Sequence, residues 1–541
     1  MQKIRLRDFI IFFLLCFTNT FVFAQTNLAL QGTASASSNR QPASFAIDNN
    51  NSSRWESVHG VDPSWIKIDL GSSRNLSSVQ IVWEAANAAT YRVQGSNDNT
   101  RWTTLASFSG GAFGGRTDNH KISGAYRYVR MYGIARSKRS DGRAWGYSIH
   151  EFRIFGEQGF AHPGVLLNKA QLDFVKENIA SNREPWKSAY AKLLNSGGST
   201  KTARRNISYR FASLNYHPAP VAVVKCTASY GEKLNYVSEG CTEQTDDALA
   251  AYTHALMWYY TGQEAHAMKA IEIMDAWSST LTEILFDQPR SAENRQIYEN
   301  GKLQAGWGAQ LFTRSAEIIR HTYSGWSPQN VQSMETHLKQ VYLPLVESGW
   351  TGGANWFATF AEAMINIAVF TNDKALFNKA TAYWEAKIPS IIYMPSDGVT
   401  PIPPSSGYNT ANKMWIYWWK PQRYIPGLET ETCRDLGHTM MGLGALINVA
   451  ETARIQGVDL YGKQKDRIIA AYELQSNYTT QLLNAMQAQG KTAPQLTQAG
   501  WIPTNNWACD VFKDGGSSAW HGFELAYNHL NGRLGVDMPQ T

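Results

Sequence analysis

Hydrophobic and polar residues alternate in short runs along the first part of the chain, and turn-forming residues separate these runs. Strand-length runs between turn signals are typical of a β-sandwich or barrel. We therefore predict an all-β domain over residues 26–157. Its clearest runs are 65–71, 78–83, 91–96, 126–132 and 149–156.

After His162 the alternation gives way to helical spacing, with apolar residues recurring every three or four positions. Gly262, Gly325 and Gly457 follow such stretches, as expected where helices end. We predict a linker at residues 157–159 and then an all-α domain over residues 160–541, built from helical hairpins packed in succession. Its clearest helices cover 246–260, 303–320, 356–370 and 435–456.

Residues 1–24 have the pattern of a secretory signal peptide. Lys3, Arg5 and Arg7 precede an apolar run at 9–15, and Ala24 provides a small residue at the expected cleavage point. The apolar run is too short for a stable membrane span, and no stop-transfer segment follows it. We expect a protein without a membrane span that is secreted, periplasmic or held at the cell surface.

Composition narrows the class further. Of the 541 residues, 43% are hydrophobic, which excludes wholesale disorder, and the mean hydropathy of −0.35 excludes a polytopic membrane protein. The formal charge of +6, about +4 without the signal segment, is spread along the chain, so we expect no nucleic-acid partner. Nineteen tryptophans and an aromatic content of 12% suit a protein that handles carbohydrate.

Four cysteines remain once the signal segment is removed, an even number that is compatible with two disulfides in an exported chain. We expect Cys226–Cys241 to close a local loop and Cys433–Cys509 to form a long-range link. Sequence alone allows three pairings, and buried free thiols are the alternative. None of the spacings resembles a zinc site.

The β region carries several short motifs in a fixed order. They are NLA at 27–29, AIDNN at 46–50, RW at 54–55, WIKIDLG at 65–71, GSNDNTRW at 95–102 and EF at 151–152. In this order they resemble a discoidin, or coagulation-factor type C, domain over almost all of residues 26–157. The resemblance implies a jelly-roll sandwich that serves as a carbohydrate-binding module in exported bacterial enzymes.

The same resemblance implies a structural calcium ion beside the loop at residues 48–53, where Asn49 stands at the family's usual glycine position. Calcium prefers hard oxygen ligands. The side chains that match the family's site are Asp48, Asn51, Ser53 and Glu151. A metal-free capped turn is the alternative.

Sugar binding by such modules uses loops at one end of the sandwich. An aromatic ring covers the apolar face of a pyranose, and polar side chains bind its hydroxyl groups. By loop position, we expect His59, Arg139 and Trp145 to take these roles.

The α region also carries ordered motifs. They are HPGVLL at 162–167, DDALAAY at 246–252, NG at 300–301, GANW at 353–356, CRDLGHT at 433–439 and ELAYNH at 524–529. In this order they resemble the alginate lyase superfamily over about residues 162–541. The resemblance implies an α/α toroid, in which inner and outer helices ring a cleft, and an acidic polysaccharide as substrate.

Lyases of this kind work by β-elimination. The C5 proton of a uronic acid is too weakly acidic to remove until donors or cations offset the charge of its carboxylate. A base then removes that proton, and an acid protonates the departing O4. Asn, Arg, His and Tyr side chains suit these tasks, so we expect no cofactor for catalysis.

We expect Asn355, Arg434 and His438 to be catalytic. Asn355 follows a Gly-Gly pair and precedes an apolar helix, which lets its amide project into a cleft. The best-known alginate lyases have Asn-His at the matching place, but Trp356 follows the Asn here, so we expect His438 to replace that histidine. Arg434 and His438 are four residues apart and are predicted to share one helix face, with Glu431 orienting the arginine. The alternative is a plain Arg434–Glu431 pair beside a core histidine.

The catalytic tyrosine is less clear, because Met440 and Met441 occupy the region where the family has its tyrosine. We expect Tyr408, in a loop, or Tyr298 to replace it. The remaining candidates for substrate contact are Trp307, Trp356, Glu431, Tyr527 and His529. For Tyr527 and His529, helix packing is the alternative.

These observations predict a monomeric, secreted lyase that cleaves alginate or a related polyuronate. A glycoside hydrolase on the same toroid is an alternative, and it needs two carboxylates about 5–10 Å apart. The pairs available for that are Glu431 with Asp435 and Asp246 with Asp247. A non-catalytic surface glycan-binding protein is the other alternative, since the Asn-His pair and the family's tyrosine are absent.

Overall fold

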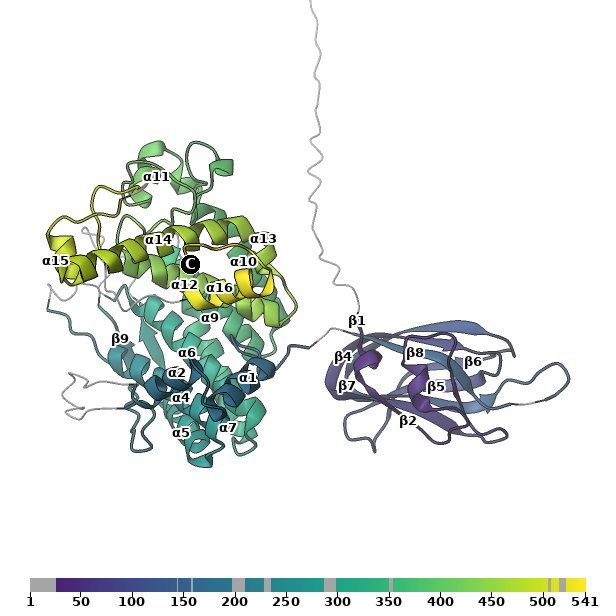
Figure 1. The fold of residues 1–541 in the computed structure, drawn as a ribbon. Helices are drawn as coiled ribbons and strands as arrows, with labels where there is room; N and C mark the ends of the chain where they lie inside the picture. The colour runs from purple at the N-terminus through teal and green to yellow at the C-terminus, as the bar shows by residue number, and fades with distance from the viewer. Residues whose placement is uncertain are drawn as a thin grey trace, which may run out of the picture. The chain divides into compact units, whose positions relative to one another are not determined.

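The alternating runs of the N-terminal region form the antiparallel strands of one curled, eight-stranded sheet in the computed structural model (Figure 1). The strands are β1 (Thr26–Asn27), β2 (Thr33–Ala36), β3 (Trp55–Glu56), β4 (Ser64–Trp83), β5 (Ala88–Ser96), β6 (Thr103–Ser109), β7 (Arg116–Arg136) and β8 (Ser148–Gly156). The runs predicted at 65–71 and 78–83 both lie on β4, which stays paired with β7 across two register shifts. β4 also pairs with β8, and β5 lies between β7 and β6.

Alternate residues of the long strand β4 fill the core of this region. Ile66, Ile68, Val79 and Ile81 are fully buried, as is Trp55 of β3. Because successive side chains of a strand point to opposite faces, a period of two places one apolar set in the core and leaves the other set toward solvent. The loops at the ends of the strands carry the candidate binding residues.

The structure describes residues 26–143, 145–156, 159–196, 210–227, 235–286, 298–349, 354–504, 507–514 and 522–541. The chain divides into two units, one that ends at Gly159 and one that begins at Phe160. The signal segment predicted at residues 1–24 lies outside the described residues. Among the helices that are described, none has the length and apolar character needed to cross a bilayer.

The second unit is built from helices, and its described residues contain one pair of short parallel strands, β9 (Val223–Lys225) and β10 (Glu283–Leu285). The described α-helices are α1 (Lys169–Ala180), α2 (Trp186–Leu194), α4 (Cys241–Thr261), α5 (Glu264–Thr280), α6 (Gly301–Thr322), α7 (Pro328–His337), α8 (Leu343–Glu347), α9 (Ala354–Phe370), α10 (Lys374–Lys387), α11 (Ala411–Tyr417), α12 (Leu436–Ile455), α13 (Leu460–Lys463), α14 (Lys465–Gln489), α15 (Ala493–Gln498) and α16 (Phe523–Tyr527). The four helices expected from apolar spacing are α4, α6, α9 and α12.

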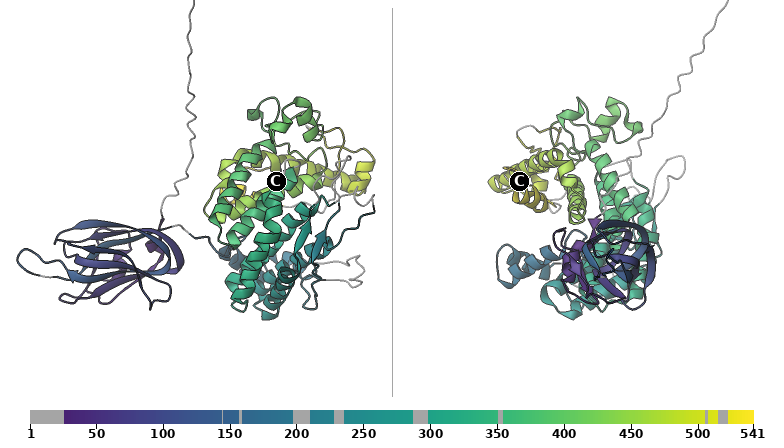
Figure 2. Two further views of the ribbon diagram at one scale, coloured as in Figure 1. Left: turned by 180° about the vertical axis from the view of Figure 1, so that it is seen from behind. Right: turned by 90° about the vertical axis from the view of Figure 1, so that its right-hand side faces the viewer.

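Four helices follow one another as a row: α4 packs on α6, α6 on α9 and α9 on α12 (Figures 1 and 2). A second layer covers the row, with α5 against α4 and α10 against α9. α9 and α12 are buried on nearly all sides, as expected of helices that are apolar all round. The predicted fold class, an all-β region followed by a mostly helical region consistent with an α/α toroid, is confirmed.

Two disulfides fix loops of the helical unit. Cys226 at the end of β9 is bonded to Cys241 at the start of α4, and Cys433 is bonded to Cys509 across 76 positions of sequence. Both predicted pairings are confirmed. The second bond matters for the site because it holds the segment 507–514 beside the loop that precedes α12.

Candidate active site

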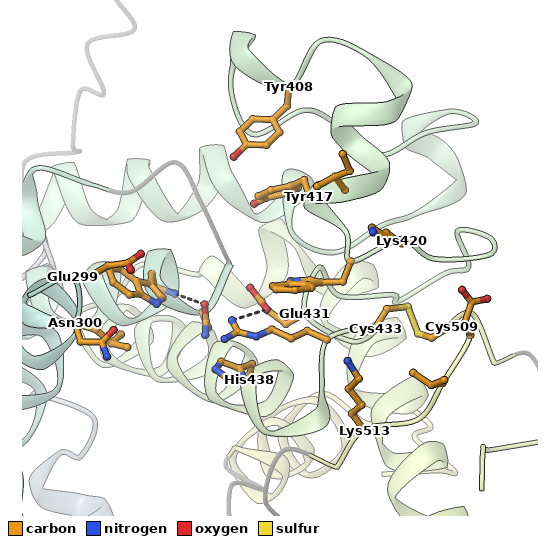
Figure 3. A pocket seen from close by; sticks show the side chains of 18 of the residues that line it. Glu299, Asn300, Tyr408, Tyr417, Lys420, Glu431, Cys433, His438, Cys509 and Lys513 are labelled. Atoms are coloured by element: carbon orange, nitrogen blue, oxygen red, sulfur yellow. Dashed lines mark hydrogen bonds and ion pairs between the residues drawn. A yellow bond between two sulfur atoms is a disulfide. The ribbon is translucent and has the colours of Figure 1, made fainter. Parts of the chain in front are cut away.

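The helical unit contains a cavity of about 940 Å³ where α6, α9 and α12 begin (Figure 3). Helix N-termini present unpaired N–H groups and a partial positive charge, so they favour an anionic ligand. Seven residues predicted from the sequence line this cavity: Trp307, Asn355, Trp356, Tyr408, Glu431, Arg434 and His438.

Asn355 is the second residue of α9 and is fully buried. Its Oδ1 accepts a hydrogen bond from the backbone N–H of Trp356 at 2.9 Å, which fixes the orientation of the amide. Its Nδ2 has no hydrogen-bond partner among the described residues. Leaving a buried donor unsatisfied costs about 1–3 kcal/mol, so this amide is suited to a ligand that brings an acceptor.

His438 lies in the first turn of α12 and is held by the residue that caps the helix. Asp435 is the N-cap, and its carboxylate accepts from the His438 backbone N–H at 2.8 Å and from the ring Nδ1 at 2.7 Å. Burial alone would raise the pKa of Asp435, but these bonds from His438 lower it. Nδ1 therefore donates to Asp435, and Nε2 has no hydrogen-bond partner among the described residues.

Arg434 reaches the cavity from the loop before α12, because the helix begins only at Leu436. The prediction that Arg434 and His438 share a helix face is therefore wrong, although both line the cavity. The Arg434 guanidinium lies 5.0 Å from the Trp419 ring centroid, and its Nη1 donates to Glu431 Oε2 at 3.3 Å.

Two buried carboxyl groups lie behind Arg434. Burial raises the pKa of Glu429 well above its usual value, and the neighbouring Glu431 raises it further. Burial also raises the pKa of Glu431, against the opposing influence of Arg434 and His438. Arg434 is thus paired with Glu431, and its side chain, 33% exposed, still lines the cavity.

Two tyrosines overhang the cavity. The rings of Tyr408 and Tyr417 are packed together, with centroids 4.8 Å apart, and both residues line the cavity (Figure 3). Burial raises the pKa of Tyr417, and Glu429 and Glu431 raise it further, so its hydroxyl keeps its proton. Sequence reasoning missed Tyr417, because the only signal was its place among the aromatic residues of 415–419.

Three predicted residues do not line the cavity. The ring of Tyr298 contacts that of Tyr236, with centroids 6.3 Å apart. Tyr527 is exposed at the end of α16, and His529 is buried with its ring stacked on Tyr461 at 3.6 Å. The contact of His529 fits the helix-packing alternative. Lining residues that were not among the predicted site residues include Glu299, Asn300, Trp419, Lys420, Asp510 and Lys513.

In the β unit, the structure brings two of the three predicted sugar-binding residues together. The rings of His59 and Trp145 meet edge to face with centroids 5.1 Å apart, and Trp145 is 40% exposed. His59 Nε2 lies 2.6 Å from Glu56 Oε1, which orients the imidazole. Arg139 pairs instead with Asp141 at 3.6 Å.

The loop predicted to hold calcium combines a tight turn with a buried acid. Ser53 Oγ donates to Asp48 Oδ2 at 2.6 Å, and Asn49 has a left-handed backbone with φ 57°, a conformation that the family's glycine adopts freely. Glu151 is fully buried, neither of its carboxylate oxygens has a hydrogen-bond partner among the described residues, and burial raises its pKa. Glu151 Oε2 lies 3.8 Å from Arg153 Nε. A buried carboxylate is a ligand type that calcium prefers. Asn51 Oδ1 lies 3.4 Å from Arg153 Nη2.

Comparison with known proteins matches an F5/8 type C domain to residues 31–152 and the alginate lyase family to residues 238–484. No curated protein matches this chain.

Solved structures similar to the β unit include two chitosan-binding modules of a chitosanase/glucanase from Paenibacillus sp. IK-5. Module 1 is 41% identical over 24% of this chain and 99% of the module, with a TM-score of 0.22. Module 2, in complex with chitotriose, is 36% identical over 24% of this chain and 100% of the module, also with a TM-score of 0.22. The CBM32 of AlyQ, in complex with 4,5-unsaturated mannuronic acid, is 22% identical over 23% of this chain and 93% of that one, with a TM-score of 0.20.

The two family matches fall on the two units of the structure, one on the curled sheet and one on the helical region that holds the cavity. The chain therefore carries an F5/8 type C domain in its N-terminal region and an alginate lyase domain in its helical region.

Proposed function

We propose that the protein is a secreted lyase that cleaves alginate or a related polyuronate by β-elimination and leaves a C4=C5 unsaturated uronate. The observation that carries this proposal is the buried Asn355 amide, whose Nδ2 lacks a partner among the described residues and which lines the same cavity as Arg434 and His438. A uronate carboxylate supplies the acceptor that the amide lacks. Arg434 adds the positive charge that stabilises the enolate-like dianion formed when C5 loses its proton.

His438 is the base in this proposal. Its Nε2 lone pair removes the C5 proton, while Asp435 holds Nδ1–H and stabilises the imidazolium that results. The short hydrogen bond to Asp435 also fixes which nitrogen is basic. Asp435 is thus a positioning residue, a role that the sequence did not indicate: there it stood as the start of the helix and as a carboxylate of the hydrolase alternative.

Tyr417 is the acid in this proposal. Its raised pKa keeps the phenol protonated, so the hydroxyl is able to donate a proton to the departing O4. Tyr408 packs on Tyr417 and is placed to hold that ring in the cavity. Together the groups balance the reaction: His438 gains the proton from C5, the C4–O4 bond breaks, and Tyr417 supplies the proton for O4.

The hydrolase alternative is less well supported by the contacts of its carboxylates. The Asp435 carboxylate accepts hydrogen bonds from the backbone N–H and the ring of His438, and Glu431 accepts one from Arg434. Asp247 is buried and accepts hydrogen bonds from Tyr216 and Trp277, so its carboxylate ties helices together. These three acids are thus hydrogen-bonded to groups of the protein itself, which favours elimination over hydrolysis.

The β unit supports the same function as a carbohydrate-binding module. His59 and the exposed Trp145 offer a polar group and an aromatic face on adjacent loops. We propose that Asp48 and Glu151 hold a structural calcium ion with oxygens of Asn51 and Ser53. Titration with EDTA is expected to lower the melting temperature of the full chain, and added Ca²⁺ to restore it; no change in Asp48→Ala relative to the native chain would contradict the metal site.

The test of the main proposal follows the ultraviolet absorbance of the C4=C5 bond on polymannuronate, polyguluronate, glucuronan and a glycosaminoglycan. We expect absorbance to rise with at least one polyuronate and Asn355→Ala to abolish the rise. Asn366→Ala is the matched control, because Asn366 is a buried asparagine of the same helix that does not line the cavity. New reducing ends without absorbance identify a hydrolase, and binding without either identifies a glycan-binding protein.

A further inference from the structure

One side of the cavity takes no part in the proposed chemistry. Its exposed groups include Asp510, Val511 and the three residues here called the basic wall, Trp419, Lys420 and Lys513. Lys420 and Lys513 lie across the cavity from Asn300 (Figure 3). Two segments distant in sequence build the basic wall, the one that follows α11 and the one around Cys509.

Several bonds join these two segments into a single wall. Gln422 donates from its backbone N–H to Ala508 O at 2.7 Å and from Nε2 to Asp510 Oδ1 at 2.6 Å. The Cys433–Cys509 disulfide and the bond from Leu436 N–H to Lys513 O at 3.1 Å attach the second segment to the start of α12. The wall is therefore fixed relative to Arg434 and His438.

The two lysines of the wall have no counter-ion within the described part of the chain: no carboxylate forms an ion pair with Lys420 or Lys513 there. Lys420 Nζ lies 5.6 Å from the Trp415 ring centroid. Two acids that line the same cavity are engaged elsewhere, Asp510 with Gln422 and Glu431 with Arg434. Two ammonium groups facing a cavity without a paired acid favour an anionic ligand.

The backbone of the wall is strained in a way that presents these side chains. Trp419 and Lys420 both have left-handed backbones, with φ of 57° and 60°. Such a conformation costs a non-glycine residue roughly 1–2 kcal/mol and is found mainly where function or surrounding structure imposes it. The buried Trp418 anchors the turn in a local core, and the Lys420 N–H donates to Trp415 O at 2.8 Å. As a result Trp419 stays 46% exposed beside Arg434.

We infer that the basic wall is a subsite for the uronate unit next to the one that is cleaved, with Trp419 against the sugar ring and Lys420 and Lys513 on its carboxylate. This inference rests on the proposed function and narrows the substrate to chains in which uronates are adjacent. In polymers where a neutral amino sugar alternates with the uronate, the neighbouring unit offers these lysines no carboxylate.

The experiment separates binding from catalysis. In full-length Asn355→Ala protein, a saturated oligouronate is titrated by calorimetry with and without Lys420→Gln and Lys513→Gln. We expect the two lysine substitutions together to raise Kd at least tenfold and to reduce its dependence on salt. Lys491→Gln, at an exposed lysine near the end of α14, is the matched control and is expected to leave Kd unchanged.

An unchanged Kd in the double lysine variant overturns the subsite, whatever the enzyme's activity. A tenfold loss of affinity together with no C4=C5 absorbance from the native protein keeps the subsite and rejects the proposed function. With an active native protein, we also expect the double variant to raise KM on a homopolyuronate while kcat changes less than twofold. Trp419→Phe is expected to retain affinity and Trp419→Leu to lose it; thermal melts of both report whether the fold is intact.

Discussion

In two places of the helical unit a histidine Nδ1 lies beside a carboxylate, but the surroundings of the other ring nitrogen, Nε2, differ. In one, His438 Nδ1 lies 2.7 Å from Asp435; in the other, His162 Nδ1 lies 3.0 Å from Glu317. His162 Nε2 also lies 3.1 Å from Asn372 Oδ1, and its ring is stacked on His321 at 4.2 Å. His438 Nε2 has no such partner in the described part of the chain, and the His438 side chain is 35% exposed.

The surroundings of Nε2 distinguish a structural ion pair from a histidine that is suited to proton transfer. Both nitrogens of His162 face acceptors, so the imidazolium form is favoured: burial alone would lower the pKa of His162, but Glu317 and Asn372 raise it. Burial alone would raise the pKa of Glu317, but His162 and His321 lower it to about 2. This pair is a buried ionic link. His438 lines the cavity and lacks a second acceptor in the described part of the chain, as the proton transfer that we propose for it requires.

The largest effect on activity is expected from replacing His438. We expect His438→Ala to lower kcat by roughly 10²–10⁴-fold, the usual contribution of a general base, with little change in melting temperature. His162→Ala is the contrast, since it is expected to lower the melting temperature and to leave kcat within a factor of two where the protein is folded. Initial rates of C4=C5 formation and thermal melts measure both. Equal losses of activity in His438→Ala and His162→Ala would show that the surroundings of Nε2 do not set the roles of the two histidines.

Next in size is the orientation of His438 by its carboxylate. We expect Asp435→Asn to lower kcat roughly 10²-fold, because an amide neither fixes the Nδ1–H tautomer nor stabilises the imidazolium. Asparagine is as good an N-cap as aspartate, so the stability of α12 is expected to be kept. Asp435→Ala, which removes the cap as well, is expected to lose a further 0.5–2 kcal/mol (roughly) of unfolding free energy in urea titrations. Full activity in Asp435→Asn would remove Asp435 from the mechanism.

The corresponding change in the structural pair acts on stability. We expect Glu317→Gln to lower the free energy of unfolding by about 1–3 kcal/mol, because it leaves buried donors imperfectly paired. Gly164 N–H, which donates to Glu317 Oε2 at 2.9 Å, is among these donors. Urea denaturation measures the loss, and kcat at low temperature is the control. If Glu317→Gln is as stable as the native chain, the Glu317–His162 pair makes no net contribution to the free energy of unfolding.

We expect the stability of the fold to fall both as pH rises above and as pH falls below an intermediate range. The raised pKa of His162 gives stability that is fully present below about pH 6.5 and is lost as pH rises through the folded-state pKa. His254 is the opposite case: burial, and then the nearby His266, lower its pKa to about 3, so stability is lost as pH falls from about 6.5 toward 3. Melting temperatures across pH test this, with His162→Gln expected to flatten the alkaline limb and His254→Gln the acid limb.

The smallest effect is expected at His321. Its Nε2 lies 3.6 Å from Glu317 Oε1 and its side chain is 25% exposed, so solvent weakens the interaction. We expect His321→Asn to change the free energy of unfolding by less than about 1 kcal/mol. A loss as large as that of Glu317→Gln would assign the buried link to His321 rather than His162.

Much of the fold was predictable because it depends on local periodicity. The alternation over β4 and the apolar spacing over α9 and α12 each predicted an element of the right type. The pairing of Cys433 with Cys509 was expected and is confirmed, although four cysteines allow three pairings and sequence alone did not decide among them. Asn355, Arg434 and His438 line one cavity, and their catalytic roles stay predictions.

What could not be predicted depends on contacts between residues far apart in the chain. Tyr298 and Tyr417 each follow an isoleucine in the sequence, but of the two only Tyr417 lines the cavity. The expected helix face shared by Arg434 and His438 does not form, because Asp435 uses its carboxylate to cap α12 and leaves Arg434 outside the helix.

The sequence by itself determined the two units, the type of their main elements and the residue types available for an elimination, because alternation, helical spacing and capping act over a few neighbouring positions. Only the tertiary structure decided which histidine keeps a free nitrogen and which amide is left without a partner. Glu317 and Asn372 are 155 and 210 positions from His162, and folding brings them to it, whereas Asp435 is three positions from His438. The sequence shows a pair of neighbouring residues, but only the packing of distant segments determines whether the histidine of such a pair has a second partner.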